Sequence, residues 1–365
     1  AGSSVAMADY AGTWQTNNVT VAANGTEKIG GIDADVTLDT EGQSVTLVYV
    51  DSTQGWINTM DSTSNVRGIV PYIVASVSGT CNTLTDDGDF KVAKFINPGT
   101  FTVCCASTVT PRNGLEYLVV AGGGGGRNNK NGAARGGGGG GGGGYRTSAF
   151  GPSPLQAPTI PAVAGAYPVT VGAGGAGGTI PGAEALPGDN SVFAGPTSIT
   201  SAGGGFGAGN VTTVGGPGGS GGGAGDGPSG GAAGVAGGTG NTPPVSPPQG
   251  KDGGPRNTNP NNNGGGGSGG GGAGGCGSSG QVSGPSYPKN GGAGGSGVDS
   301  DITGVNTSYA NGGAGGPTAQ STPVAGTANS GNGASGGGGG YPPGSDITGA
   351  QGGSGIVVIR YKFQN

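Results

Sequence analysis

The first third of the chain contains short runs in which apolar and polar residues alternate. Such alternation over about four to eight residues is typical of a strand with one buried face. The clearest runs are Val19–Val21, Val36–Leu38 and Val45–Val50, and all are rich in β-branched residues. No window shows the period of about 3.6 residues that marks a helix, so we expect almost no α-helix. The predicted strands lie near 18–23, 34–39, 44–50, 54–58, 72–77, 89–96 and 100–105.

Turn residues separate these runs, and the apolar faces between the turns are thin. Asn24-Gly25 lies between two alternating segments and predicts a two-residue hairpin turn. A single copy has few large side chains to bury, and several copies packed together would share a larger core. We therefore expect this region to form an intertwined homotrimer. Its main large side chains are Trp14, Trp56, Phe90, Phe95 and Phe101.

Two apolar runs lie at the two ends of the remaining chain. Glu116–Val120 precedes the first glycine run, and Ile356–Tyr361 follows the last one. A third run, Tyr167–Val171, also has strand character. We expect the two end runs to pair in one small sheet that closes a domain.

Composition changes the picture between these end runs. The chain has 365 residues and 96 glycines, and 84 of these glycines fall in residues 115–365. Ordering a residue costs about 1–2 kcal/mol, and this region has too little apolar surface to offset that cost. One ordered solution is a bundle of extended left-handed helices with about three residues per turn, whose backbones hydrogen-bond laterally because glycine has no side chain. The segments would be the runs near 121–126, 136–144, 172–178, 203–209, 215–225, 230–240, 264–277, 291–297, 311–316, 331–340 and 351–355.

Charge and residue types exclude several chemistries. The chain has no histidine and a net charge of −5, so it lacks the commonest general base and metal ligand, and it has no basic surface for nucleic acid. No apolar run approaches the roughly 20 residues of a membrane span. Cys81, Cys104, Cys105 and Cys276 match no metal-binding spacing, and we expect free thiols, with a single disulfide of unassigned pairing as the open alternative. We expect no enzymatic activity, no cofactor and no metal site.

The ordered series of motifs resembles the glycine-rich domains of bacteriophage tail fibres and phage adhesins, including those of marine phages. The motifs that carry this resemblance are EYLVVAGGGGG (116–126), GGGGGYRTS (140–148), YPVTVGAGGAGG (167–178), DNSVFAGPTSITSAGGG (189–205) and GGSGIVVIRY (352–361). In some such adhesins the domain folds as the bundle described above, and variable loops at one end bind host receptors. The resemblance implies the same arrangement here.

Earlier segments also resemble phage fibre sequences. Residues 17–56 are similar to a β-hairpin unit of trimeric fibres, and 85–103, TDDGDFKVAKFINPGTFTV, resembles a connector that precedes the glycine-rich domain. Related connectors carry a histidine where this chain has Ala93 and Lys94, so a role tied to that histidine does not carry over. The sequence thus predicts an N-terminal β fibre region (1–84), a β connector (85–114) and a glycine-rich domain (115–365).

The expected function is binding: a virion tail fibre or adhesin that attaches the particle to a host surface glycan or outer-membrane protein and contacts other tail or fibre proteins. Two alternatives stay open, namely a purely structural virion fibre, spacer or decoration protein, and a cellular surface or filament protein that shares the domain. Tyr and Arg side chains in loops between glycine runs are favoured binding anchors, although aromatic side chains also fill gaps at the ends of a bundle. The receptor-binding candidates are Tyr145, Arg146, Lys251, Arg256, Tyr287, Tyr309 and Tyr341.

Overall fold

The computed structural model divides the chain into two compact units, Ala1–Ile69 and Val70–Asn365. The structure is mainly β, and its one helical turn among the described residues is the 3-10 turn Ser153–Leu155. The expectation of a β-rich fold with almost no α-helix is therefore confirmed. The residues described are 2–62, 72–107, 112–128, 135–179, 183–209, 214–226, 234–257, 265–281, 289–338 and 348–364.

The first unit contains a three-stranded sheet and a separate strand pair. The sheet has the order β1 (Ser4–Ala8), β4 (Ser44–Asp51), β5 (Gly55–Ser62), and β2 (Val19–Val21) pairs with β3 (Val36–Leu38). Few of the unit's apolar side chains are fully buried, and these are Leu38, Val45 and Leu47. The thin core expected from the sequence is therefore present.

The predicted hairpin turn at Asn24-Gly25 is wrong. The two strands that flank it, β2 and β3, do pair with each other, but residues 22–35 connect them. The chain does turn at Gly25, which has a φ of +63°, and the Glu27 N–H donates to the Asn24 carbonyl. It then runs to Ile29, which bridges to Trp56 of β5. Residues 28–30, which would belong to the second strand of a tight hairpin, thus hydrogen-bond to Trp56 of the neighbouring sheet instead.

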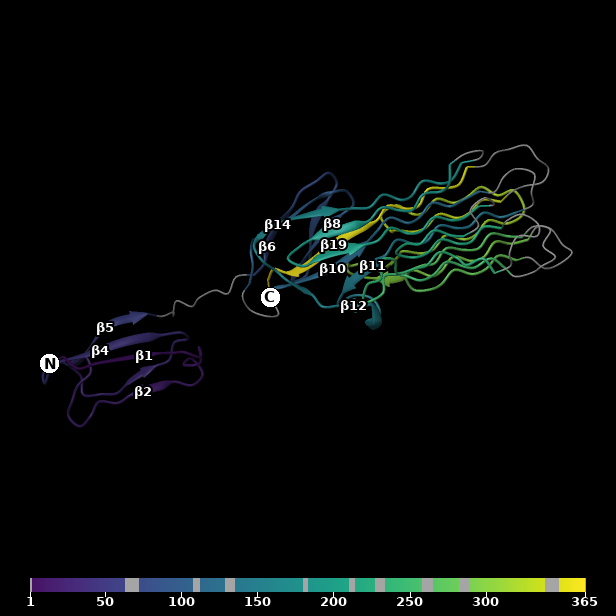
Figure 1. Cartoon of the computed structure of the whole chain (residues 1–365). Helices are drawn as coiled ribbons and strands as arrows, with labels where there is room; N and C mark the ends of the chain where they lie inside the picture. The colour runs from purple at the N-terminus through teal and green to yellow at the C-terminus, as the bar shows by residue number, and fades with distance from the viewer. Residues whose placement is uncertain are drawn as a thin grey trace. The chain divides into compact units, whose positions relative to one another are not determined.

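The second unit has two facing sheets at one end (Figure 1). Their shared core contains Phe101 and Phe193 from the smaller sheet and Tyr361 from the larger one, with ring centroids of Phe101 and Tyr361 5.8 Å apart. The smaller sheet has the order β16 (Ser198–Ser201), β15 (Ser191–Ala194), β14 (Gly165–Thr170), β9 (Gly99–Cys105), β6 (Val74–Val77). The larger sheet has the order β12 (Gln156–Ala157), β11 (Tyr145–Ser148), β10 (Gly114–Val120), β19 (Ile356–Lys362), β8 (Phe90–Phe95), β7 (Thr83–Asp87), and β13 (Ile160–Pro161) also pairs with β10.

The two end runs of the glycine-rich region pair as the sequence predicted. β10 and β19 lie antiparallel at the middle of the larger sheet, with Leu118 opposite Val358. They are buried on both faces, which explains their continuous apolar sequences. Alternate residues face the smaller sheet, and the others pack under the hairpin of β17 (Val298–Ser300) and β18 (Thr307–Tyr309). The sheet therefore closes the domain where its chain enters and leaves.

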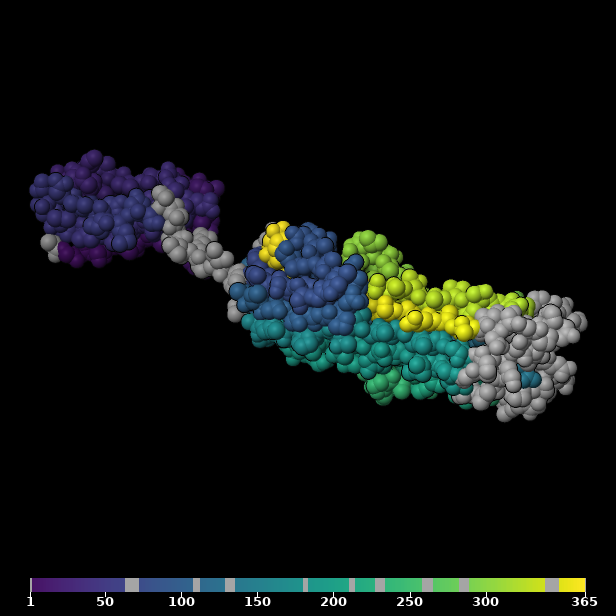
Figure 2. Space-filling model, turned by 90° about the horizontal axis from the view of Figure 1, so that it is seen from above, coloured from purple at the N-terminus to yellow at the C-terminus, as the bar shows by residue number. Residues whose placement is uncertain are grey.

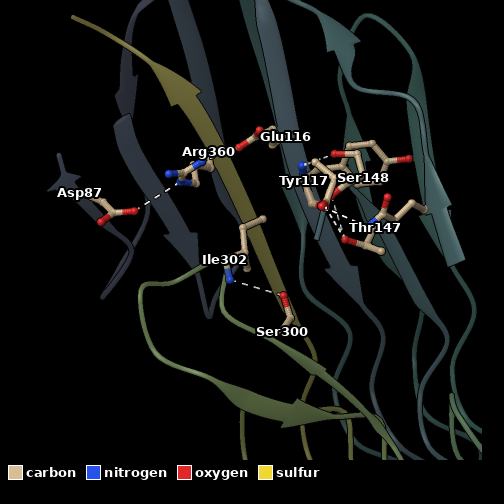
Figure 3. A network of polar contacts seen from close by, with 10 residues as sticks. Asp87, Glu116, Tyr117, Thr147, Ser148, Ser300, Ile302 and Arg360 are labelled. Carbon is tan, nitrogen blue, oxygen red and sulfur yellow. Dashed lines mark hydrogen bonds and ion pairs between the residues drawn. The ribbon is translucent and has the colours of Figure 1, made fainter. Parts of the chain in front are cut away.

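Arg360 of β19 ties three strands of this sheet together. Its guanidinium lies between Asp87 of β7, at 3.3 Å, and Glu116 of β10, at 2.8 Å (Figure 3). The same group lies 3.6 Å above the centroid of the Phe90 ring. These contacts join the connector strands, the entry strand and the exit strand of the glycine-rich region.

The connector is therefore part of the second unit rather than a separate piece. β8 pairs with β19, and β9 pairs with β14. The sequence placed divisions after residues 84 and 114, whereas the compact units meet between Ile69 and Val70.

The glycine segments run away from the sheets and lie side by side (Figure 1). At the centre, the nine glycines 136–144 donate their N–H groups in a repeat of three residues. Gly136, Gly139 and Gly142 donate to segment 265–271, the next residue of each triplet donates to 331–337, and the third donates to 202–208, over 2.7 to 3.0 Å. The carbonyls of the same nine-residue run accept from 121–127, 220–226 and 313–316. This central segment thus has six neighbours, all bound through the backbone.

Close packing explains why every position of the central run is glycine. A Cβ atom built on any of Gly136–Gly144 would lie 1.8 to 2.4 Å from an atom of a neighbouring segment, mostly a backbone carbonyl oxygen. Segments at the surface have such neighbours on fewer sides. In 172–179 every third residue, Ala173, Ala176 and Thr179, is exposed, and the glycines between them face inward. In these two segments, the buried one is glycine throughout, whereas the surface one has a non-glycine residue at every third position.

Two of the predicted segments are in fact two segments each. Within 215–225 the chain folds back, as the hydrogen bond from the Gly222 N–H to the Gly216 carbonyl shows. Within 264–277 it folds back again, and there the Gly272 N–H donates to the Gly275 carbonyl. Conversely, 183–189 and 321–328 have no long glycine run and still bond into the bundle, through Leu186 to Ala176 and Gly326 to Gln351. Figure 2 shows the yellow segment around Gln351 as a strip between neighbouring segments on the surface.

We expect Gly140→Ala to destabilise the second unit by about 3 kcal/mol or more, because overpacking a rigid interior costs about 1–3 kcal/mol and here the obstacle is a backbone carbonyl. The new Cβ would lie 2.1 Å from the Gly124 oxygen. Guanidinium unfolding measures the loss. The matched control is Ala176→Ser, which also adds one heavy atom but at an exposed position. Equal stability of the two variants would contradict the packing argument.

Candidate functional site

The bundle has two ends with different contents. One end adjoins the sheets, and the chain returns there through β11, β15, β17 and β19. We call the opposite end, away from the sheets, the outer end (Figure 1). Backbone bonds near it link residues from distant parts of the sequence, such as Gly136 to Gly265, Gly178 to Gly126 and Gln281 to Asn290. The chain therefore reaches the outer end repeatedly, and residues that flank many of its reversals meet there.

Charged side chains gather at the outer end. Arg127 follows the glycines 122–126 directly, and its side chain crosses the ends of two segments, so that a Cβ on Gly178 or Gly209 would meet it. The Arg127 Nη1 donates to the Ala183 carbonyl and lies 3.2 Å from the Glu184 carboxylate. A long side chain thus fills the space that glycine leaves open.

Asp226 forms the centre of a second ionic group. Its carboxylate lies 3.3 Å from the Arg256 Nε and 4.0 Å from the Arg135 Nε, and it accepts the Gly265 N–H at 2.7 Å. Asp226 and Arg256 are 2% and 6% exposed. Removing one partner of such a buried group leaves the others uncompensated, at a cost of about 3–5 kcal/mol. The group therefore fixes the outer ends of four chain segments, which contain Arg135, Asp226, Arg256 and Gly265.

Lys289 and Thr318 add a further link at this end. The Lys289 N–H donates to the Thr318 hydroxyl at 2.7 Å, and the Thr318 N–H donates to the Lys289 carbonyl at 2.9 Å. Both residues are buried. Four basic side chains, Arg127, Arg135, Arg256 and Lys289, thus stand at the described outer end with two acidic ones, Glu184 and Asp226.

The structure separates the seven predicted binding residues. Tyr145 and Tyr309 lie at the sheet end in one apolar core with Ile302, and they are 1% and 3% exposed. Their aromatic rings therefore fill the gap beneath the hairpin of β17 and β18 and are not available to a receptor. This corrects the sequence interpretation of both residues. A tyrosine in a loop between glycine runs looks the same in sequence whether it caps the bundle or projects from it.

The other predicted residues fall in three places. Arg146 is half-buried in β11, next to Tyr145. Lys251 lies in a bundle segment, where its N–H donates to Gly272 and its carbonyl accepts from Gly221. Arg256 lies at the outer end in the Asp226 group. Tyr287 and Tyr341 lie outside the described residues.

Polar contacts beside Tyr145 are also structural. The Ser148 hydroxyl accepts the Tyr117 N–H at 2.9 Å, and the Thr147 hydroxyl donates to the Tyr117 carbonyl at 3.1 Å (Figure 3). Burial raises the pKa of Tyr145 to about 12 and also raises the pKa of Tyr309. Both phenols therefore stay neutral at physiological pH and act as apolar filling.

Sequence reasoning missed the ionic groups at the outer end, although a signal was present. Arg127 directly follows a glycine run, and Arg135 directly precedes one. A long cationic side chain at that position marks the point where a segment leaves the lattice of backbone bonds. The partners Glu184 and Asp226 lie far away in sequence, so their pairing could not be read from the chain.

Potential metal ligands do not cluster in the described part of the chain. Its Cys, Asp and Glu side chains form no group of three or more that could hold a metal ion. All four cysteines are free, as the sequence predicted, and the structure shows all four to be exposed. Among the residues placed by the structure, no helix is both long and apolar enough to cross a membrane.

A family model described as a glycine-rich domain matches residues 97–362, which is more than half of the chain. The chain therefore belongs to this glycine-rich domain family. The match begins shortly before β9 and ends in β19, so it covers strands of both facing sheets together with the bundle. A comparison with curated proteins finds no match to the chain.

We expect Asp226→Asn to lower the free energy of unfolding by about 3 kcal/mol, because it removes the carboxylate charge between two arginines in a buried site. Thermal or guanidinium unfolding measures the change. Asp301→Asn, which alters an exposed carboxylate of the same unit, is the matched control. A variant as stable as this control would contradict the assigned role of Asp226.

We expect the stability of the second unit to fall between about pH 10 and pH 12. Tyr145 has a pKa of about 12 when folded, against 10.0 for an ordinary tyrosine, so the unfolded chain loses the proton first. Stabilisation is complete below pH 10 and is lost as the pH rises towards 12, at about 1.4 kcal/mol per pKa unit. Unfolding of the wild-type chain and Tyr145→Phe at pH 9 and pH 11.5 tests this. The variant should lose less stability, and an equal loss in both proteins would count against the assignment.

Proposed function

We propose that the chain is a structural protein of a bacteriophage virion, a tail fibre or adhesin that attaches the particle to a surface glycan or outer-membrane protein of the host. The outer end of the glycine-rich bundle carries the contact in this proposal. The first unit supplies assembly, as a homotrimer, and connection to other tail or fibre proteins.

The observation that supports the proposal is the arrangement of the bundle. Its interior is fixed by backbone bonds that accept no side chain, whereas the described residues that flank many reversals meet at the outer end. The chain leaves this end near Asn257, Gln281 and Gly338 and returns near Gly265, Lys289 and Thr348. Binding residues are commonly found on loops that a rigid scaffold positions.

The sequences between these points suit recognition. Residues 258–264 hold four asparagines, and 282–288 and 339–347 contain Tyr287 and Tyr341. Tyr supplies a large contact area at low entropic cost, and Asn supplies adaptable hydrogen bonding.

We expect the labelled full-length chain to bind bacteria selectively, and the double variant Tyr287→Ala/Tyr341→Ala to bind at least tenfold more weakly. Flow cytometry across a panel of strains measures the binding, and circular dichroism verifies that the variant is folded. Tyr10→Ala, which removes an exposed tyrosine from the first unit, is the matched control and should bind as the wild type does.

Two outcomes would contradict the adhesin proposal. A folded wild-type chain that binds no strain of a broad panel would favour a structural fibre, spacer or decoration protein. Equal binding by the wild type and the double variant would place the receptor contact elsewhere on the chain.

A further inference from the structure

The sheet of the first unit has one covered face and one open face. Val5, Met7, Leu47 and Trp56 point to the covered face, where they line an apolar hollow of about 170 Å³ that residues 21–29 close from the other side. Side chains alternate along a strand, so the residues between these belong to the opposite face. The register places them in two rows across the sheet, Ser4–Val48–Ile57 and Ala6–Thr46–Met60.

The open face is apolar and lacks a cover within the described part of its unit. Ala6 and Met60 are exposed, Met60 to 67%, and Val48 and Ile57 are only half-buried. The central strand β4 carries apolar residues on both faces, Val45 and Leu47 on one and Val48 on the other. Strands with that pattern are typically buried on both sides. The sequence of β4 therefore points to a second layer over Val48.

The charge distribution restricts what this layer is. Residues 2–62 hold eight acidic and one basic side chain, a net charge of −7. The two rows of the open face contain no charged residue at all. A basic partner would be expected to bind where the acids are, at the turns around 33–41, rather than on an uncharged surface. Two copies of an acidic unit, in contrast, approach each other at low cost only through a face without charges.

The small core gives an independent reason for self-association. Fully buried apolar side chains in this unit are few, namely Leu38, Val45 and Leu47. A unit of fewer than about 70 residues rarely supplies enough buried surface alone and usually needs disulfides, a metal or oligomerisation. The described first unit has no cysteine and no group that could hold a metal. Copies that cover each other's open face would add Val48, Ile57 and Met60 to the core.

We propose that the open face of the β1–β4–β5 sheet is the surface through which copies of this chain associate. In the homotrimer proposed above, each copy turns these uncharged rows towards a common three-fold axis, where the three open faces form one shared core. The inference rests on that proposed assembly, and it does not depend on whether the outer end of the bundle binds a receptor.

The test uses sedimentation of the full-length chain and two variants that place a negative charge on the open face. We expect the wild type to form an oligomer whose mass is a multiple of 33.9 kDa. Met60→Glu and Ala6→Glu change neighbouring exposed positions, so each protomer should stay folded while association weakens at least tenfold. Tyr10→Glu adds the same charge at a position that is 95% exposed outside this face, and it should associate as the wild type does.

Two results would overturn the proposal. A wild-type chain that is monomeric at about 100 µM has no such interface. An oligomer that persists unchanged in both Met60→Glu and Ala6→Glu assembles through another surface, such as the outer edge of β1. Circular dichroism and the unfolding transition of the first unit, which carries both substitutions, verify that a loss of association does not come from unfolding.

Discussion

The structure depends on the close approach of backbones that have no side chains between them. In the run Gly136–Gly144 each N–H donates to one of three neighbouring segments, and carbonyls along the same run accept from three others. Buried backbone groups must be paired, and here the pairing is lateral in every direction instead of lying in one sheet plane. A single Cβ would meet a neighbouring segment's atom at 2.4 Å or less. The absence of side chains is therefore what allows this region to be ordered, although glycine is the residue that loses most freedom on folding.

The close packing of glycine backbones also determines where other residue types occur in the bundle. Small side chains such as Ala173 and Ala176 occur at every third position of a surface segment, where they face outward. Long cationic side chains occur where a segment leaves the lattice, as Arg127 and Arg256 do, and their charge is balanced by Glu184 and Asp226. Tyr145 and Tyr309 lie at the sheet end, where they pack into an ordinary apolar core.

The positions of most strands in the first third of the chain could be predicted from local sequence, whereas the neighbours of each bundle segment could not. Alternation found β2, β3, β4, β8 and β9 closely, because a half-buried strand shows its pattern in its own residues. It missed β1 and β7, since SVAMA has apolar residues on both faces and TLTDD has only one apolar residue. The bundle itself was foreseen, but the neighbours of each segment were not, because lateral bonds between glycine backbones leave no side-chain signature. The fold-back at Gly216–Gly222 was hidden for the same reason.

For the candidate site, too, the sequence identified single residues by type but did not show which residues lie next to them. Arg256 was recognised as a candidate from its residue type, but its buried partner Asp226 lies 30 residues earlier and became evident only in three dimensions. Tyr145 and Tyr309 were misread because an aromatic residue next to a glycine run serves equally well as a cap or as a contact. The physical difference is where the chain reverses. At the sheet end, the Tyr145 and Tyr309 side chains pack beneath the hairpin of β17 and β18, so these two side chains are held inside. At the outer end, the described residues form no sheet over the segment ends, and sequence changes beyond these ends need not disturb the backbone bonds that order the bundle.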